Sequence, residues 1–118
     1  MRISQELRDR TKALSSSVIR LYIALPVKRV EVAVLGKQLL RSGTSVAVHS
    51  REASRARSDA EFCSKLDVLS QEADESMLWL EHLNEDCGIS AGQIKPIHKE
   101  CDELIAIFTT IVAKVRRK

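Results

Sequence analysis

Residues 58–84 read SDAEFCSKLDVLSQEADESMLWLEHLN, and this stretch decides the fold. Apolar or small side chains recur in alternating steps of four and three, at Phe62, Leu66, Leu69, Ala73, Ser76, Leu80 and Leu83. A period of 3.5 residues is typical of helices that pack at shallow angles. Ser58 and Glu61 have the spacing of a capping box, in which each side chain accepts from the other residue's amide. We therefore predict a helix over 59–84, with Gly88 in the following turn.

The same kind of pattern predicts three further helices, over 3–25, 28–55 and 91–116. The first ends at Leu25 because Pro26 disfavours helical geometry in the residue before it. Gly43 lies inside the second, where glycine costs about 1 kcal/mol relative to alanine, and we interpret it as a point of close helix approach. The start of the fourth stays open between a cap at Ser90 and a later first turn at Pro96. The expected core lines are Ile3, Leu7, Leu14, Val18, Leu21 and Leu25; Val32, Leu35, Leu39, Ser42, Val46 and His49; and Ile97, Cys101, Leu104, Phe108, Ile111 and Val115.

Four helices with short connections predict an all-α fold, an antiparallel up-down-up-down four-helix bundle formed by a single domain over 1–118. Four glycines and two prolines are too few for a many-stranded sandwich or barrel. No apolar run approaches the ~20 residues that cross a bilayer, and the N-terminal sequence has no signal-peptide core. We expect a cytoplasmic protein with no membrane partner.

The three cysteines, Cys63, Cys87 and Cys101, are odd in number and form no C-x-x-C pair. We interpret them as small hydrophobic residues and expect neither a disulfide framework nor a zinc site. The sequence contains no nucleophile elbow and no glycine-rich phosphate loop. We expect no catalytic residues, no metal and no cofactor, and therefore no enzyme.

Polar residues recur on one face of the second predicted helix, at Ser42, Ser45, His49 and Glu52. A ferritin-like metal site would need two Glu-x-x-His motifs and two further glutamates, whereas this chain has one reversed His-x-x-Glu. We favour a structural polar network in which Arg41 or Arg51 bonds Glu72 or Glu75 across the helix pair or across a subunit interface. The members of this predicted network are Arg41, Ser45, Glu52, Glu72 and Glu75.

Several apolar residues fall outside the core lines and favour oligomerisation. They are Val34, Leu40, Ile105 and Val112. Trp79 lies one step from the core position Leu80, so it belongs either to the core edge or to a subunit interface, and both interpretations stay open.

Charge is distributed unevenly along the chain. Residues 1–57 contain 12 basic and 4 acidic side chains, a net of +8, and residues 58–118 contain 7 and 12, a net of −5. An up-down-up-down bundle gathers the two termini and the second connection at one end. That end is expected to carry the basic residues Arg2, Arg8, Arg10, Lys12, Arg51, Arg55, Arg57, Lys114, Arg116, Arg117 and Lys118. A repeated basic surface of this kind attracts phosphate backbones.

Several motifs along the chain resemble those of the bacterial four-helix-bundle family named after proteins encoded in 23S rRNA intervening sequences. They include QLLRSGTSV at 38–46, REA at 51–53, RARS at 55–58, EADES at 72–76 and WLE at 79–81. The resemblance implies a homopentameric ring, and the related accessory protein of diversity-generating retroelements works with nucleic acid. Residues 47–50 read Ala-Val-His-Ser where the family pattern has Gly-Ala-Asn-Tyr.

The sequence thus predicts a non-enzymatic homo-oligomeric scaffold or adaptor, pentameric by resemblance, with an unidentified protein partner. The alternative is a nucleic-acid-binding accessory protein that contacts the phosphate backbone. The expected nucleic-acid or partner contacts are Arg51, Arg55, Arg57, Lys114, Arg116 and Arg117.

Overall fold

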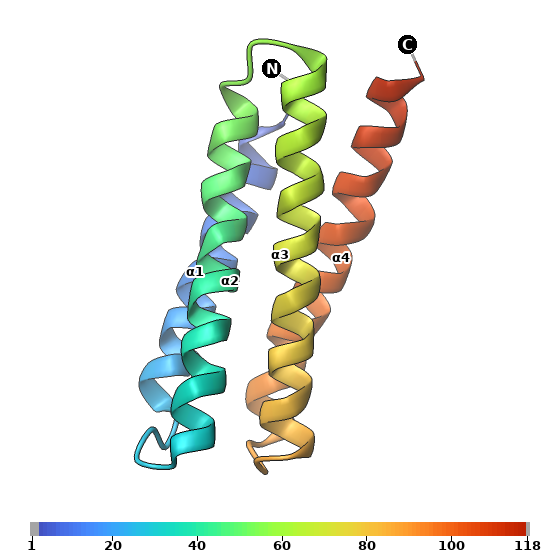
Figure 1. The fold of residues 1–118 in the computed structure, drawn as a ribbon. Helices are drawn as coiled ribbons and strands as arrows, with labels where there is room; N and C mark the ends of the chain where they lie inside the picture. Colours follow the sequence, from blue (N-terminus) through green and yellow to red (C-terminus); the bar gives the residue numbers. More distant parts are fainter. Residues whose placement is uncertain (1–2, 118) are drawn as a thin grey trace.

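A computed structural model describes residues 3–117 and contains four α-helices in this range: α1 (Gln5–Ala24), α2 (Val30–Ser54), α3 (Asp59–Glu85) and α4 (Ala91–Arg116). Successive helices run in opposite directions, as Figure 1 shows, in a bundle of 49 × 21 × 19 Å. The predicted fold class is confirmed. The α2–α3 connection lies at the same end of the bundle as the start of α1 and the end of α4.

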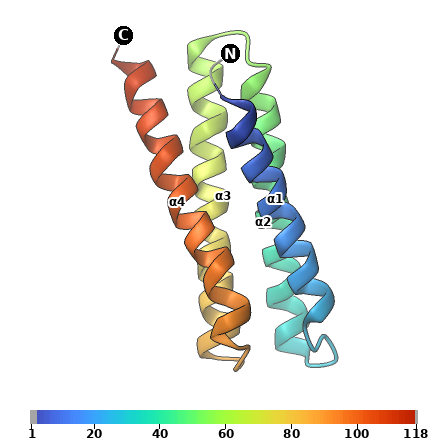
Figure 2. The ribbon, with the colours of Figure 1, turned by 180° about the vertical axis from the view of Figure 1, so that it is seen from behind.

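The four helices do not close evenly around the core. Helix α2 packs most extensively against α3, and α4 packs against α3, whereas α1 and α4 contact each other least. Figures 1 and 2 show from opposite sides that the C-terminal half of α4 leans away from the other helices. The position of α4 is therefore set mainly by its contacts with α3.

The first two helix boundaries follow local hydrogen bonding. Ser4 caps α1 because its Oγ accepts from the Leu7 amide at 3.1 Å. Helix α1 ends at Ala24, one residue before the predicted end, because Pro26 favours an extended Leu25. Helix α2 was expected to begin at residue 28 but begins at Val30, because the Arg29 amide donates to the Pro26 carbonyl in a turn.

The cap of α3 is a partial capping box. The Ser58 Oγ accepts from the Glu61 amide at 3.0 Å, as predicted. The Glu61 carboxylate accepts from the Arg57 amide at 3.2 Å, one residue before the predicted donor. At the other end, Gly88 has a φ of +75°, which lets the Ile89 amide reach the Leu83 carbonyl at 2.9 Å.

The structure resolves the start of α4 in favour of Ser90. The helix begins at Ala91, and Pro96 lies inside it. The Ser90 hydroxyl donates to the Gln93 side chain at 2.9 Å rather than accepting from a backbone amide. Because Pro96 has no N–H, it removes only one bond in the second turn, and the buried Ile94 and Ile97 hold the helix on either side of it.

The predicted core line of α3 is confirmed, since all seven of its positions are buried. In α2 the buried line contains Gly36 instead of Leu35 and Ser50 instead of His49. In α4 it contains Val112 instead of Ile111, and Val115 is half-buried. A helix with 3.6 residues per turn drifts against a 3.5-residue repeat, so a straight helix exchanges a three-residue step for a four-residue step. In α1 the buried line includes Thr11, whereas Leu7 is half-buried.

Gly43 and the three cysteines are buried in the core, as expected for residues with a packing role. Gly43 is buried, and a Cβ at this position would lie 2.8 Å from Val18 Cγ2, which confirms a close approach of α1 and α2. The three free cysteines are all buried. Burial raises the pKa of the Cys101 thiol to about 12, so this group is protonated at neutral pH and is a poor nucleophile.

Candidate functional site

The six basic residues expected to contact a partner lie at the end of the bundle that holds the α2–α3 connection (Figure 1). Arg51, Arg55 and Arg57 lie around that connection, and Lys114, Arg116 and Arg117 lie at the end of α4. At this end α4 leans away from the other helices (Figure 2). Arg2 and Lys118, expected at the same end, lie outside the described residues.

Two of these six residues already have acidic neighbours. The Arg116 Nη2 atom bonds the Asp67 carboxylate on α3 at 2.7 Å, and this hydrogen bond raises the pKa of Arg116 above its usual value. The Arg57 Nε atom lies 3.9 Å from the Glu61 carboxylate. Their charges are therefore partly compensated within the chain.

Arg10 also differs from its expected role in the basic surface. It donates to both carboxylate oxygens of Glu100 on α4, at 3.0 and 2.6 Å, and to Glu103 at 3.3 Å. The hydrogen bond to Glu100 raises the pKa of Arg10. Arg10 therefore joins α1 to α4, and its charge is paired within the bundle.

A group of positive charges lies between α1 and α2. An open cavity of about 330 Å³ is lined by Gln5, Arg8, Asp9 and Lys12 of α1 and by Arg51, Ser54 and Arg55 of the α2 end. Four cations and one carboxylate give this lining a formal charge of +3. Within residues 3–117, no ion pair engages Lys12, Arg51 or Arg55 with a carboxylate.

Sequence reasoning counted Arg8 and Lys12 among the basic residues of this end but did not place them beside Arg51 and Arg55. The signal was present, since each pair has the i, i+4 spacing that puts two side chains on one helix face. Antiparallel pairing brings the beginning of α1 beside the end of α2 and so joins the two pairs in one cavity.

The hydrogen bonding of Arg8 is incomplete. Its Nη2 donates to the Gln5 side-chain oxygen at 2.6 Å, and the Gln5 amide donates to Asp9 at 2.8 Å. The Arg8 Nε atom is buried and has no acceptor within the described part of the chain. Since a buried donor without a partner costs about 1–3 kcal/mol, this guanidinium lies in an unfavourable environment as the bundle stands.

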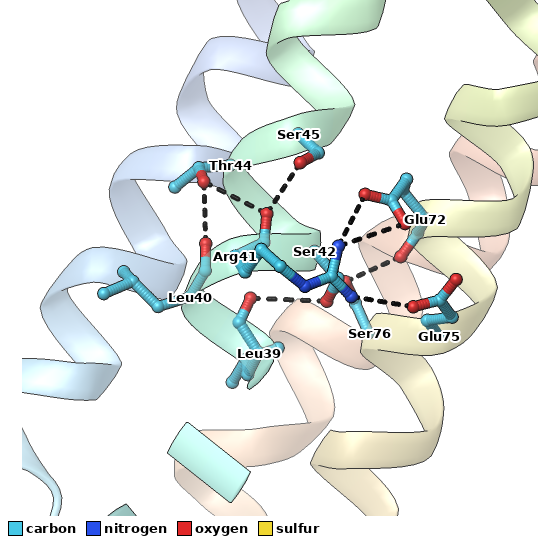
Figure 3. Close-up of polar contacts among 9 residues, drawn as sticks. All are labelled: Leu39, Leu40, Arg41, Ser42, Thr44, Ser45, Glu72, Glu75 and Ser76. Atoms are coloured by element: carbon cyan, nitrogen blue, oxygen red, sulfur yellow. Dashed lines mark hydrogen bonds and ion pairs between the residues drawn. The ribbon is translucent and has the colours of Figure 1, made fainter. Parts of the chain in front are cut away.

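A second polar cluster joins α2 and α3 at mid-bundle and is drawn in Figure 3. Arg41 lies between two glutamates of α3: its Nη1 is 3.1 Å from Glu72 and its Nη2 is 2.9 Å from Glu75. The hydrogen bond to Glu75, followed by the charges of both carboxylates, raises the pKa of Arg41. Of the two arginines considered in the sequence, it is Arg41 that bonds these glutamates, and it does so within one chain.

Of the other two predicted members of the network, Ser45 belongs to this cluster and Glu52 does not. The Ser45 hydroxyl donates to the Arg41 carbonyl at 2.8 Å, so it joins the cluster through the backbone. Glu52 lies apart, bonded to His49 at 3.0 Å and to Lys65 at 3.4 Å. Partial desolvation would raise the pKa of Glu52, but Lys65 and then His49 outweigh it and leave that pKa lowered.

A hydrogen bond omitted from the predicted network holds its buried side together. The Ser42 and Ser76 hydroxyls lie 2.7 Å apart, and neither residue is exposed to solvent. Each hydroxyl also faces a backbone carbonyl of its own helix, Ser76 that of Glu72 at 2.8 Å and Ser42 that of Leu39 at 3.4 Å (Figure 3). The small polar residues that interrupt the apolar lines therefore satisfy one another across the helix pair.

Replacing Glu72 with alanine is expected to lower the melting temperature by about 4 °C, equivalent to about 1 kcal/mol. Only 12% of the Glu72 side chain is exposed, whereas 52% of its partner Arg41 is exposed, so solvent screens this ion pair in part. Glu75→Ala is the matched control: its bond is shorter, but 45% of its side chain is exposed, and a smaller loss is expected. Calorimetry and light scattering measure stability and assembly. A Glu72→Ala protein unchanged in both would exclude the network role.

Trp79 is half-buried and packs against the core. Its indole Nε1 is enclosed and has no acceptor within residues 3–117. Because that atom is already covered, a partner subunit would not reach it in this conformation. The contact supports the core-edge interpretation, while a role of the exposed part of the ring in an interface stays a prediction.

Residues 3–117 contain no group of three or more His, Cys, Asp or Glu side chains placed to hold a metal ion. None of the described helices is both long and apolar enough to span a membrane. Two features of the described surface are therefore considered as candidate functional sites. They are the cation-lined cavity and the Arg41 cluster.

The sequence profile of the 23S rRNA-intervening sequence protein family matches residues 4–110. The chain belongs to this family. The family assignment agrees with a crystal structure of a protein with unknown function from the S23 ribosomal protein family of Bacteroides thetaiotaomicron. That protein is 33% identical to this chain; the match covers 90% of this chain and 97% of that one, with a TM-score of 0.83. No curated protein matches the chain significantly. The resemblance of the motifs and the predicted bundle are thereby confirmed.

Proposed function

We propose that this member of the 23S rRNA-intervening sequence protein family is a cytosolic, non-enzymatic scaffold that assembles from several copies of the chain. The observation that carries the proposal is a set of exposed aliphatic residues near the α1–α2 turn, named the aliphatic cluster, at the end of the bundle opposite Arg51, Arg55 and Lys114. Its members are Ile19, Ile23, Val27, Val30 and Val34, with exposed fractions of 42 to 76%. An exposed apolar surface of this kind is typical of a protein interface.

The aliphatic cluster belongs to consecutive parts of the chain. Ile19 and Ile23 lie one turn apart near the end of α1, and Val30 and Val34 lie one turn apart at the start of α2. Val27 lies in the short turn between them. The occupant that we propose is a second copy of the same chain, and the number five comes from the family resemblance.

Of the four residues that sequence reasoning assigned to oligomerisation, Val34 alone belongs to this cluster. Leu40 and Ile105 are half-buried against the chain's own core. Val112 is only 6% exposed and is a core residue, because the buried line of α4 shifts to it from Ile111.

Light scattering of the full chain at micromolar concentration tests the assembly. The expected mass is a multiple of the 13.2 kDa chain, five-fold for a pentamer. A charge introduced by Ile23→Glu or Val30→Glu is expected to reduce the assembly to monomers, because burial of an unpaired carboxylate is costly. Leu78→Glu on α3 is the control, since Leu78 is exposed but lies outside the cluster. A monomeric wild-type protein would overturn the proposal.

A second candidate function is non-sequence-specific binding of a nucleic-acid backbone, favoured by the unpaired cations Lys12, Arg51 and Arg55 at one end of the bundle. An assembled scaffold would repeat this surface once per subunit and so raise the avidity for a long polyanion. Only four aromatic residues occur in the chain, so base stacking contributes little in this proposal.

Fluorescence anisotropy with a labelled RNA across a salt series tests the second function. The affinity is expected to fall steeply with salt, and the Arg51→Gln, Arg55→Gln double variant should lower the slope of log affinity against log salt by about 1 to 2. Lys95→Gln with Lys99→Gln removes the same charge from the start of α4, at the opposite end, and should change binding little. Absence of binding at low salt, or an affinity independent of salt, would refute backbone recognition.

A further inference from the structure

We propose that the cavity between α1 and α2 is a discrete binding site for one phosphate group, with Arg8, Lys12, Arg51 and Arg55 as its cationic donors. The inference concerns the same end of the bundle as the polyanion proposal and gives it a specific site. It does not depend on assembly, since all lining residues come from one chain.

Charge is the first argument for a phosphate ligand. Asp9 is the one carboxylate among the lining residues, and it already accepts a hydrogen bond from the Gln5 amide. The Ser54 hydroxyl donates to the Ser50 carbonyl at 3.0 Å, so its proton is engaged. The donors that remain for a ligand are therefore mainly guanidinium and ammonium groups, which bind phosphate oxygens strongly.

Incomplete hydrogen bonding is the second argument. The Arg8 Nε has no acceptor, and the three other cations that line the cavity cannot supply one. Neighbouring atoms cover Nε in this conformation, so an anion in the cavity meets the terminal nitrogens of Arg8 and reaches Nε only if the side chain turns. With that turn, the anion would satisfy a donor that the chain alone leaves unpaired.

Size and shape are the third argument. A volume of about 330 Å³ is on the order of ten times the share of one water molecule in the liquid, so a phosphate and its remaining waters fit together. The cavity is open, which permits either a free phosphate or a phosphate that belongs to a larger molecule.

A purely structural role competes with this proposal for two of the residues. Arg51 lies in the last turn of α2 and Arg55 is its C-cap, where cations complement the helix macrodipole. That role does not involve Arg8 and Lys12, which lie in the first half of α1. A measurement of ligand affinity separates the two roles, because a macrodipole contribution changes stability without creating a phosphate site.

Isothermal titration calorimetry of the full chain with inorganic phosphate, at constant ionic strength set with chloride, tests the site. The expected result is one phosphate per chain. Arg8→Gln and Arg51→Gln should each weaken the affinity about tenfold, because each removes charge-assisted hydrogen bonds. Lys114→Gln is the matched control: it removes one charge from the same end but outside the cavity, and its affinity should stay within about twofold of wild type.

Nuclear magnetic resonance distinguishes a discrete site from general electrostatic attraction, because only a phosphate bound at Arg8 changes the chemical shift of its side chain. The Arg8 Nε–H signal is expected to shift on addition of phosphate and to stay in place on addition of chloride. Circular dichroism of each variant shows that it is folded. No phosphate binding by the wild-type chain, or equal weakening by Arg8→Gln and Lys114→Gln, would overturn the site.

Two short RNAs of one sequence, with and without a 5′-phosphate, identify the source of the group. Tighter binding of the phosphorylated RNA, with loss of that advantage in Arg8→Gln, indicates a terminal phosphate. Equal binding that Arg8→Gln weakens indicates a backbone phosphate. Phosphate binding with no RNA binding indicates a small phosphorylated molecule, and it would refute the nucleic-acid function while supporting the site. RNA binding unaffected by Arg8→Gln, without phosphate binding, would leave that function standing and remove the site.

Discussion

Replacing Phe108 with alanine is expected to lower the free energy of unfolding by about 3–5 kcal/mol. Phe108 has no exposed surface and is one of the two largest fully buried side chains among residues 3–117. A small domain has about 5–15 kcal/mol of stability in total, so this single change would remove a large share of it. Denaturant unfolding followed by circular dichroism measures the loss.

The Phe108→Ala substitution is expected to increase local opening of α4 as well as to lower the global stability. Helix α4 leans away from α1 and is held mainly by α3 (Figure 2), so a cavity at Phe108 is expected to weaken the attachment of its C-terminal half. Amide hydrogen exchange in residues 105–116 is expected to accelerate more than in α2. Phe108→Leu should cost only about 1 kcal/mol because it keeps most of the volume. Thr109→Ala, at an exposed neighbouring position, is the control. A loss below about 1 kcal/mol for Phe108→Ala would contradict this description of the core.

Replacing Gly43 with alanine is expected to destabilise the bundle by about 1–2 kcal/mol, although alanine is the better helix former by about 1 kcal/mol. The new Cβ would lie 2.8, 3.0 and 3.2 Å from three atoms of the Val18 side chain. A β-branched residue in a helix has one strongly preferred rotamer, so Val18 does not turn away easily. The clash must therefore be relieved by separating α1 from α2.

A double-mutant cycle tests this cause directly. In a Val18→Ala background the obstructing methyl groups are absent, and Gly43→Ala should become neutral or stabilising. Gly92→Ala is the matched control, because no atom lies within 4 Å of a Cβ at this helical position. If Gly43→Ala were equally harmful with and without Val18, steric contact between the helices would not be its cause.

The helices and their order followed from the sequence because helical periodicity and end signals act locally. The steps of four and three in α3 identified every buried position of that line, and Pro26 marked the end of α1. Local signals were less complete where two of them competed. Ser90 and Pro96 each suggested a start for α4, and the buried Ile94 between them explains why the earlier start prevails.

The candidate sites were only partly predictable. Arg41 and the two glutamates of α3 were named correctly because facing helices in a bundle bring such residues together. Glu52 was assigned to the same network, but it bonds Lys65 instead, because it lies three turns beyond Arg41, about 16 Å along the helix axis. The one-residue shift of the buried line from His49 to Ser50 on α2, about 100° around the axis, comes from the difference between 3.6 residues per turn and a 3.5-residue repeat.

The sequence by itself determined the family, the four helices and the end of the bundle where positive charge gathers, because each depends on local periodicity, motifs and topology. Only the tertiary structure decided which charges are free. Arg10 is paired with Glu100, 90 residues away, whereas Arg8 lines a cavity with Arg51. The lean of α4 and the direction of each side chain settle those pairings, and neither can be read from spacing along the chain.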